Sequence, residues 1–112
     1  MSNSLTHVIQ VYFAKNFIEK TIGLIGKKNP HAIFFKTRFG IHTFGMQFPI
    51  DVLILDSKNN VVKCKENFKP NRLFLWNPKY NGVLELPEGT IKTKKIKIND
   101  KIDICDIIAS DS

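Results

Sequence analysis

The chain has 112 residues, of which 43% are hydrophobic and 24% are charged. This is the size and composition of one globular domain, so wholly disordered, fibrous and low-complexity chains are excluded. Seventeen basic and ten acidic residues give a net charge of +7, which favours encounters with anionic partners. Nearly all of the basic residues are lysines, however, and two arginines are few for a protein that recognises nucleic acid.

The first third of the chain predicts a strand, a helix and a second strand. Residues 8–13 are β-branched and aromatic, which is typical of a strand. Apolar residues then recur at helical spacing and Gly26 stands where a helix would end, so a helix is predicted over residues 16–25. Residues 32–35 predict a short strand. Positions 37–49 hold two glycines and three phenylalanines, whose rings require burial.

The rest of the chain predicts strands joined by turns. Residues 50–56 and 61–65 predict a hairpin, because the turn between them contains asparagines that tolerate a left-handed backbone. Further strand-like segments lie at residues 73–76, 83–86, 95–98 and 102–104. We find no repeat and no linker. We therefore expect a single domain over residues 1–112 with a mainly β fold, namely a small two-sheet sandwich or a barrel-like fold with one short N-terminal helix.

The cysteines bear on the compartment. Cys64 and Cys105 are far apart in the sequence, which excludes a zinc ribbon and a thioredoxin-type motif. Two buried free thiols fit a reducing cytosol. No segment has the roughly eighteen consecutive apolar residues of a transmembrane helix, and the N-terminal residues lack the basic opening of a signal peptide. We therefore expect a cytoplasmic protein without membrane contact.

Five segments stand in an order and spacing that are specific in combination. They are Gly23-Leu24-Ile25, Ala32-Ile33-Phe34-Phe35, residues 44–53 (Phe-Gly-Met-Gln-Phe-Pro-Ile-Asp-Val-Leu), residues 83–91 (Val-Leu-Glu-Leu-Pro-Glu-Gly-Thr-Ile) and residues 98–102 (Ile-Asn-Asp-Lys-Ile). Together they resemble the small bacterial and archaeal family catalogued as domain of unknown function 192, over about residues 12–104. The resemblance implies a β-rich fold with two sheets and implies no established activity. The chain departs from the family at Gly45, where an aromatic residue is usual, and at Lys27-Lys28, where an arginine is usual.

Asp51 is the most informative acidic residue. It lies in a predicted strand whose two faces are both apolar, so the strand is expected to be covered on both sides. A buried carboxylate requires hydrogen bonds or a cation. Asp51 therefore either accepts hydrogen bonds from the backbone of a neighbouring loop, which we favour, or belongs to a ligand or catalytic site. Glu85, inside Val-Leu-Glu-Leu, poses the same alternative.

Three further residues carry expectations about their surroundings. Asp100 lies in a predicted turn and is expected to accept local backbone hydrogen bonds. Met46 either lines an adaptable apolar pocket or fills the core. Trp76 precedes Asn77-Pro78 and is expected to be partly exposed.

The segment between Lys20 and Ile50 contains basic residues and no acid. One interpretation is a cationic rim for an anionic ligand, with Phe39 and Phe44 as stacking faces for bases. The other, which we favour, is a solvated lysine surface over buried phenylalanines. The predicted basic surface comprises Lys27, Lys28, Lys36, Arg38 and His42. The histidines have no second ligand nearby in the sequence, so no metal site is predicted.

The sequence supports three hypotheses about function. The leading one is a non-enzymatic binding module whose pocket, for a small molecule or a partner protein, lies near Phe44, Met46, Asp51 and Glu85. The second is an enzyme that uses Asp51 and Glu85 as a carboxylate pair, with or without a divalent metal. The third is nucleic-acid binding through the basic surface. Phosphate-binding glycine loops, dinucleotide fingerprints and nucleophile elbows do not occur in the sequence, so no cofactor is predicted.

Overall fold

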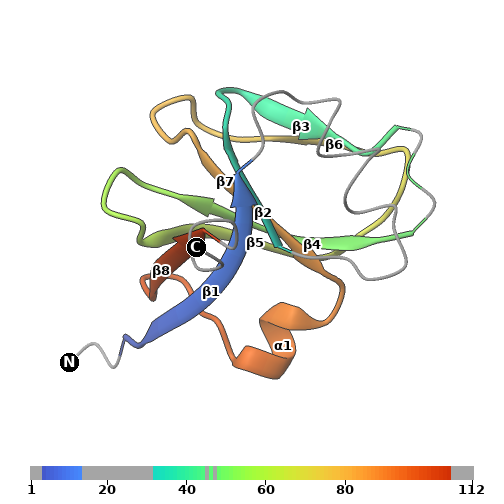
Figure 1. Ribbon diagram of the computed structural model, residues 1–112. Coiled ribbons are helices and arrows are strands. Elements are labelled where there is room, and N and C mark those ends of the chain that lie inside the picture. The colour runs from blue at the N-terminus through green and yellow to red at the C-terminus, as the bar shows by residue number, and fades with distance from the viewer. Residues whose placement is uncertain (1–3, 14–31, 45, 47, 107–112) are drawn as a thin grey trace.

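The computed structural model describes residues 4–13, 32–44, 46 and 48–106. Its elements are β1 (Thr6–Phe13), β2 (Ala32–Lys36), β3 (Gly40–His42), β4 (Ile50–Leu55), β5 (Val61–Phe68), β6 (Leu73–Leu75), β7 (Gly82–Pro87), α1 (Thr90–Lys94) and β8 (Lys101–Asp106). Six strands form one sheet in the order β5-β4-β7-β2-β1-β8, and β3 and β6 form a second, small sheet (Figure 1). The described part is therefore mainly β, with two sheets that do not close into a barrel and one short helix.

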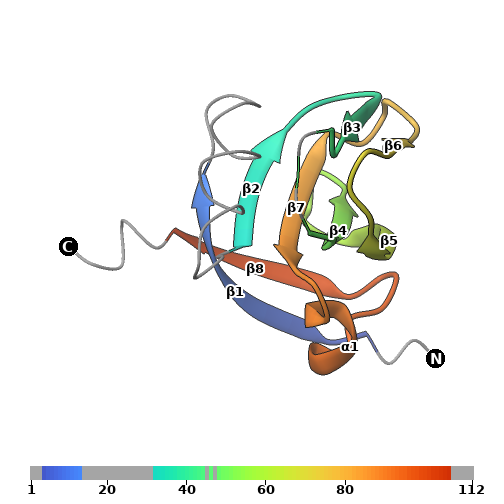
Figure 2. The same ribbon diagram turned by 90° about the vertical axis from the view of Figure 1, so that its right-hand side faces the viewer.

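The central strands β4 and β7 place two cores on opposite faces of the large sheet. Every residue of β4 is buried, and its alternate side chains enter different cores. Leu53 and Leu55 pack in the helix-side core together with Ile91 of α1. Val52 and Ile54 pack in the small-sheet core, which β3 and β6 cover. Figure 2 shows this arrangement from the side, with the small sheet and α1 at opposite ends of the curved large sheet.

The small sheet is attached to the large sheet by aromatic packing. Ile41 of β3 pairs with Phe74 of β6, and both are buried in the small-sheet core. The ring of Phe74 lies 5.7 Å from the ring of Phe68 and 5.5 Å from that of Trp76. Trp76 is buried and its indole N–H donates to the carbonyl of Tyr80 at 2.7 Å. The expected partial exposure of Trp76 is therefore wrong, because the ring fills the core while a backbone acceptor satisfies its polar atom.

The predicted hairpin is confirmed as β4 and β5, and Asn59 in its turn is left-handed, with φ of 64°. The helix predicted over residues 16–25 lies outside the described residues, as does the whole connection between the parallel strands β1 and β2. The described helix is α1, near the C-terminal end, which the sequence did not indicate.

The strand-like alternation at residues 95–98 lies instead in the cap of α1 and the turn that follows it. Lys95 is left-handed, with φ of 57°, and the N–H of Ile96 donates to the carbonyl of Ile91 at 3.0 Å. This wrap-around bond is the usual way to end a helix with a left-handed residue. It buries Ile96 beside Ile91 and leaves Ile98 exposed. The helix in the described part of the chain, α1, is too short to cross a membrane.

Candidate functional site

The two buried carboxylates face opposite sides of the large sheet. In the antiparallel pair of β4 and β7, Asp51 lies opposite Leu86, and Val52 lies opposite Glu85. Directly opposite residues share a face of the sheet. Asp51 therefore shares its face with Leu86 in the helix-side core, whereas Glu85 shares its face with Val52 in the small-sheet core. The shared carboxylate site that the sequence left open is not formed.

Asp51 is fully buried and bonded to two backbone groups. Its Oδ1 accepts the N–H of Asn67 at 3.0 Å, and its Oδ2 accepts the N–H of Ile91 at 2.9 Å. The prediction that Asp51 accepts backbone hydrogen bonds is confirmed. One carboxylate thus connects strand β4 to the end of β5 and to α1.

The bond to Asn67 stabilises a bulge in β5. Ile50 of β4 lies opposite Phe68, but Val52 lies opposite Lys65, so two residues of β5 face Asp51 alone. Such a bulge bends its strand and redirects the side chains that follow. Asn67 adopts the left-handed φ of 50° that the bend requires. Phe68 consequently turns into the small-sheet core.

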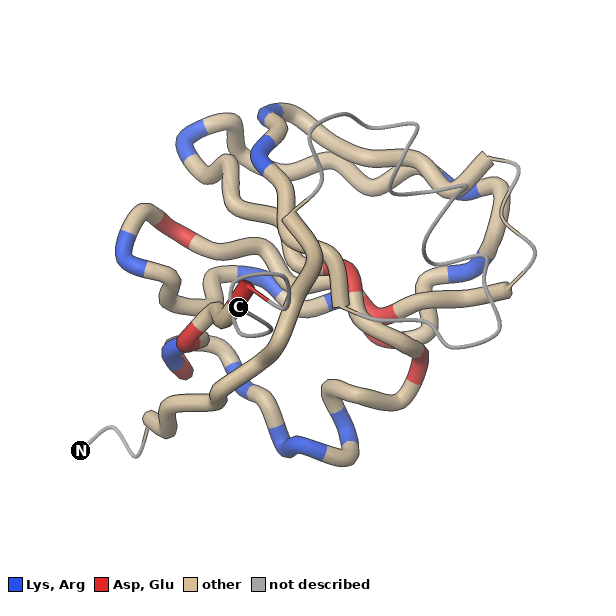
Figure 3. The backbone as a smooth tube through the Cα atoms, viewed as in Figure 1, with Lys and Arg blue, Asp and Glu red and all other residues tan. Residues whose placement is uncertain are grey.

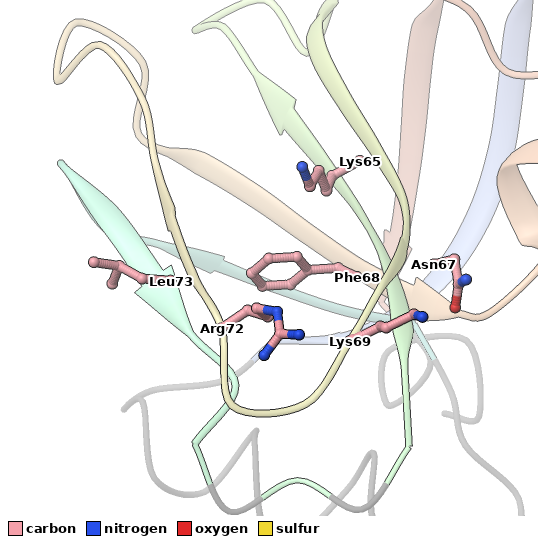
Figure 4. A pocket seen from close by; sticks show the side chains of 6 residues that line it. All are labelled: Lys65, Asn67, Phe68, Lys69, Arg72 and Leu73. Atoms are coloured by element: carbon pink, nitrogen blue, oxygen red, sulfur yellow. The ribbon is translucent and has the colours of Figure 1, made fainter.

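A pocket of about 230 Å³ opens beside this bulge, between β5 and β6. Its lining consists of Lys65, Asn67, Phe68, Lys69, Arg72 and Leu73. Figure 4 shows Phe68 in the middle of these side chains, with Lys65 on one side and the Arg72 and Lys69 side chains on the other. The lining thus combines an apolar wall with three cationic groups.

The loop that carries Lys69 and Arg72 is held by one buried residue, Thr43. The hydroxyl of Thr43 donates to the carbonyl of Lys69 at 2.7 Å and accepts the N–H of Arg72 at 3.0 Å. The carbonyl of Thr43 accepts the N–H groups of Asn71 and Met46, at 3.0 and 3.1 Å. The bonds to Lys69, Asn71 and Arg72 fix Thr43 against the pocket loop. Two of the predicted pocket residues lie next to Thr43: Phe44 follows it and is exposed, and Met46 donates its N–H to the Thr43 carbonyl and is buried in the small-sheet core.

The surroundings of the pocket are strongly cationic. Residues 32–50 and 67–84 contain no Asp or Glu. Lys63 of β5 adds to the cationic groups of the lining: its ammonium group and that of Lys65 lie 5.9 and 5.8 Å from the centre of the buried Phe74 ring. In the described part of the chain, the one ion pair joins His7 to Asp100, away from these lysines and Arg72. Figure 3 shows basic positions along the β3 and β6 side of the molecule and acidic positions elsewhere.

The acidic residue nearest to these cations in the sequence is Glu66, whose charge affects the pKa of Cys64. Burial, together with the negative charges of Glu66, Asp100 and Asp51, raises the pKa of the Cys64 thiol to about 11. Cys64 packs against the helix-side core, on the face of β5 opposite Lys63 and Lys65. Its thiol is thus protonated at neutral pH, and a nucleophilic role is disfavoured. Cys64 and Cys105 are both free and half-buried, which corrects the expectation of full burial.

The predicted basic surface is only partly described. Lys27 and Lys28 lie outside the described residues. Lys36 and Arg38 are exposed at the end of β2 and just before β3. His42 lies on β3, where its ring stacks on that of Phe44 at 4.8 Å. Among the described residues, no three His, Cys, Asp or Glu side chains come together as metal ligands.

Sequence reasoning did not find the pocket, although a signal for it was present. Lys63 and Lys65 share parity in a strand, and Lys69 and Arg72 follow within a segment that has no acid. The chain thus has a second basic segment without acidic residues, in addition to the one near residues 20–50. What the sequence did not show is that Thr43 brings these two segments together.

The chain is similar to known proteins along nearly its whole length. The family model of uncharacterised proteins named DUF192 (Uncharacterized ACR) matches residues 1–104. The chain belongs to the DUF192 family. It is 34% identical over 100 residues to a UPF0127 protein of Pyrococcus abyssi, covering 84% of this chain and 85% of that protein. It is also 34% identical over 107 residues to a UPF0127 protein of Pyrococcus horikoshii, covering 90% and 92%.

Two crystal structures share the fold of this DUF192 protein. One is a protein of unknown function from Novosphingobium aromaticivorans, with a TM-score of 0.63 and 16% identity, covering 86% of this chain and 71% of that chain. The other is a candidate transcription regulator from Sinorhizobium meliloti, with a TM-score of 0.60 and 18% identity, covering 86% and 78%. At these identities the likeness shows the fold alone. These relatives therefore indicate no function for this DUF192 member.

Proposed function

We propose that this protein is a binding module that takes an anionic small molecule with an apolar portion in the pocket between β5 and β6. The observation that carries the proposal is the combination of Lys65, Lys69 and Arg72 with the apolar side chains of Phe68 and Leu73 around one hollow. Cations gathered without a carboxylate partner repel one another, and an anion among them relieves that repulsion. Arginine also suits bidentate contact with a carboxylate or phosphate.

The residues singled out in the sequence support this pocket in different ways. Asp51 positions the bulge that contains Asn67, and Met46 and Phe44 lie next to Thr43, which holds the loop that carries Arg72. Glu85 lies beneath, in the small-sheet core that the pocket adjoins through Phe68. Asp51 and Glu85 act in this proposal as buried supports of the site.

The free thiols support a cytoplasmic location. Cys64 and Cys105 are free, and free thiols persist in a reducing environment. We therefore place the module in the cytoplasm, where phosphorylated and carboxylated metabolites are abundant candidates for the ligand.

The experiment is thermal unfolding with defined probes at low ionic strength. The probes are phenyl phosphate, inorganic phosphate and the neutral compound benzyl alcohol. Phenyl phosphate is expected to raise Tm most, because the cations take the phosphate and the apolar wall takes the ring. A ligand at about 100 times its Kd adds about 2.7 kcal/mol to the free energy of unfolding, which is a shift of several degrees for a domain of this size.

A pair of double variants with equal charge change locates the site. In Lys69→Gln/Arg72→Gln the shift with phenyl phosphate is expected to disappear. In Lys92→Gln/Lys94→Gln, on the exposed face of α1, it is expected to remain. Equal loss in both variants would show a general charge effect and contradict the proposed site, as would the absence of any shift in the unmodified protein at millimolar probe.

A further inference from the structure

The outer face of the small sheet is an apolar strip. Ile41 and Phe74 point into the core, so the neighbouring residues of β3 and β6 point outward. Leu73 and Leu75 on this outer side are each 60% exposed, and Phe39 and Phe44 at the two ends of β3 are 65% and 56% exposed. Large apolar side chains that are exposed together on and beside one small sheet mark an interaction surface.

The two exposed phenylalanines lie at backbone positions of defined geometry. Phe39 has a left-handed φ of 76°, and the N–H of Gly40 donates to the carbonyl of Arg38 at 2.9 Å across this turn. A bulky residue rarely adopts this conformation. Phe44 stacks on His42 with an angle of 20° between the rings, and its N–H donates to His42 Nδ1 at 3.3 Å. Both rings are therefore more than half exposed at defined places beside β3.

Positive charge frames the strip at both ends. The chain has two arginines, and one precedes each strand of the small sheet, Arg38 before β3 and Arg72 before β6. Because β3 and β6 are antiparallel, the two arginines lie at opposite ends of the strip. Arg72 also lines the proposed anion pocket, so the strip and the pocket are continuous. The segments that form them contain no Asp or Glu.

We propose that this strip binds single-stranded nucleic acid, with bases stacked on Phe39 and Phe44 and a backbone phosphate in the pocket of Lys65, Lys69 and Arg72. The inference rests on the proposed function, because it makes the phosphodiester one form of the pocket's anion. A single strand consists of flat bases joined by negatively charged phosphates. It therefore matches a surface that has exposed rings, Arg38 at one end, and Lys65, Lys69 and Arg72 at the other. Bases within a duplex are stacked on each other, so only an unpaired strand can offer their faces to these rings.

The first measurement is fluorescence anisotropy with labelled dT12 and U12 at several salt concentrations, with a 12-base-pair duplex for comparison. Both single strands are expected to bind more tightly than the duplex, and the two arms show whether DNA or RNA is preferred. The logarithm of the binding constant is expected to fall with the logarithm of salt concentration, by about 0.7 per phosphate contact. Duplex binding as tight as single-strand binding would overturn the inference.

Variants then separate stacking from charge. Phe44→Ala and Phe39→Ala are each expected to weaken dT12 binding by roughly 5- to 150-fold without changing the salt slope. Phe44→Tyr, which keeps a stacking ring, is expected to retain binding. Phe13→Ala removes a phenylalanine that is half exposed on β1, away from the small sheet, and is expected to leave binding unchanged. Lys69→Gln/Arg72→Gln is expected to lower the salt slope by about 1.4, for two lost contacts.

Three outcomes decide between this inference and the proposed function. If phenyl phosphate raises Tm but neither oligonucleotide binds, the inference fails and the pocket proposal stands. If poly-glutamate of equal charge binds as tightly as dT12 and Phe44→Ala has no effect, the surface takes acidic chains without stacking, and the inference also fails. If neither phenyl phosphate nor oligonucleotide binds, both proposals fail.

Discussion

Asp100 shows how one side chain fixes the start of the chain to its last third. Its carboxylate accepts the N–H groups of Leu5 and Lys97, each at 3.0 Å, and contacts His7 Nε2 at 2.7 Å. The prediction that Asp100 accepts local backbone hydrogen bonds is confirmed for Lys97, and the bonds to Leu5 and His7 extend it across the fold. Burial by itself raises the pKa of this carboxyl, but the bonds from Leu5, His7 and Lys97 outweigh it and bring the pKa below its ordinary value.

The lowered pKa of Asp100 makes its contribution to stability depend on pH. A carboxyl whose pKa is lower in the folded state stabilises the fold above its unfolded pKa, and this contribution is lost as pH falls through the folded pKa. Asp100→Asn is therefore expected to reduce the free energy of unfolding near pH 7 by about 1–3 kcal/mol. The deficit is expected to shrink as pH falls below about 4, the ordinary range of an aspartate.

Urea unfolding between pH 7 and pH 2.5 measures this dependence. Asp103→Asn is the matched control, because Asp103 is exposed on β8, near Asp100. A deficit for Asp100→Asn that stays constant over this pH range would mean that the carboxylate charge contributes nothing.

At the scale of elements, the bulge in β5 depends on a left-handed residue. Asn67 is exposed and has φ of 50°, and its backbone N–H rather than its side chain bonds to Asp51. A side chain with a Cβ is strained in this conformation by about 1–2 kcal/mol, asparagine less than most and glycine not at all. Asn67→Ala is therefore expected to destabilise the fold by about 1 kcal/mol, whereas Asn67→Gly is expected to be close to neutral.

Chemical denaturation of the two variants tests this expectation. Phenyl phosphate titrations of the same variants show whether the bulge also shapes the pocket. If alanine and glycine change stability equally, the backbone conformation of Asn67 does not determine the stability of the bulge.

The elements that the sequence predicted well are those decided by neighbours in the chain. The hairpin of β4 and β5 follows from an apolar run, an asparagine turn and a returning run. The small sheet is different, because β3 has three residues and pairs with a strand more than thirty positions later. Thr43, which joins these segments, bonds to Lys69 and Arg72 across 26 and 29 positions. No local pattern contains that information.

The short helix was missed for a related reason. The segment Thr-Ile-Lys-Thr-Lys of α1 has two β-branched threonines, and the following Lys-Ile-Lys-Ile alternates like a strand. The segment becomes helical because Ile91 and Ile96 both reach the helix-side core and because Asp51 accepts the N–H of Ile91. Tertiary contacts outweigh weak local preference in so short an element.

At the scale of the whole molecule, strand register decides which candidate site exists. Alternation along β4 and β7 correctly places Asp51 and Glu85 among apolar neighbours. Whether they share a face depends on the pairing of Asp51 with Leu86, which is a property of two distant strands together. A shift by one residue would place both carboxylates on one side. The sequence could therefore nominate both residues but could not determine their relation.

The same sheet also couples the two cores. Leu53 and Ile54 are consecutive and fully buried, yet Leu53 packs in the helix-side core and Ile54 in the small-sheet core. Leu53→Ala and Ile54→Ala are each expected to lower the free energy of unfolding by about 2–5 kcal/mol. Because both cores share β4 and β7, we expect one cooperative transition in either variant.

The single tryptophan makes this coupling measurable. Trp76 lies in the small-sheet core, so its fluorescence follows that core, while far-UV circular dichroism follows all strands. Leu53→Ala creates a cavity in the helix-side core, on the face of the sheet opposite Trp76. The urea midpoint of Trp76 fluorescence is nevertheless expected to fall together with the midpoint of circular dichroism. If the dichroism midpoint fell and the Trp76 midpoint did not move, the two cores would unfold separately. The small sheet and its pocket would then be an independently stable unit, which the continuous burial of β4 argues against.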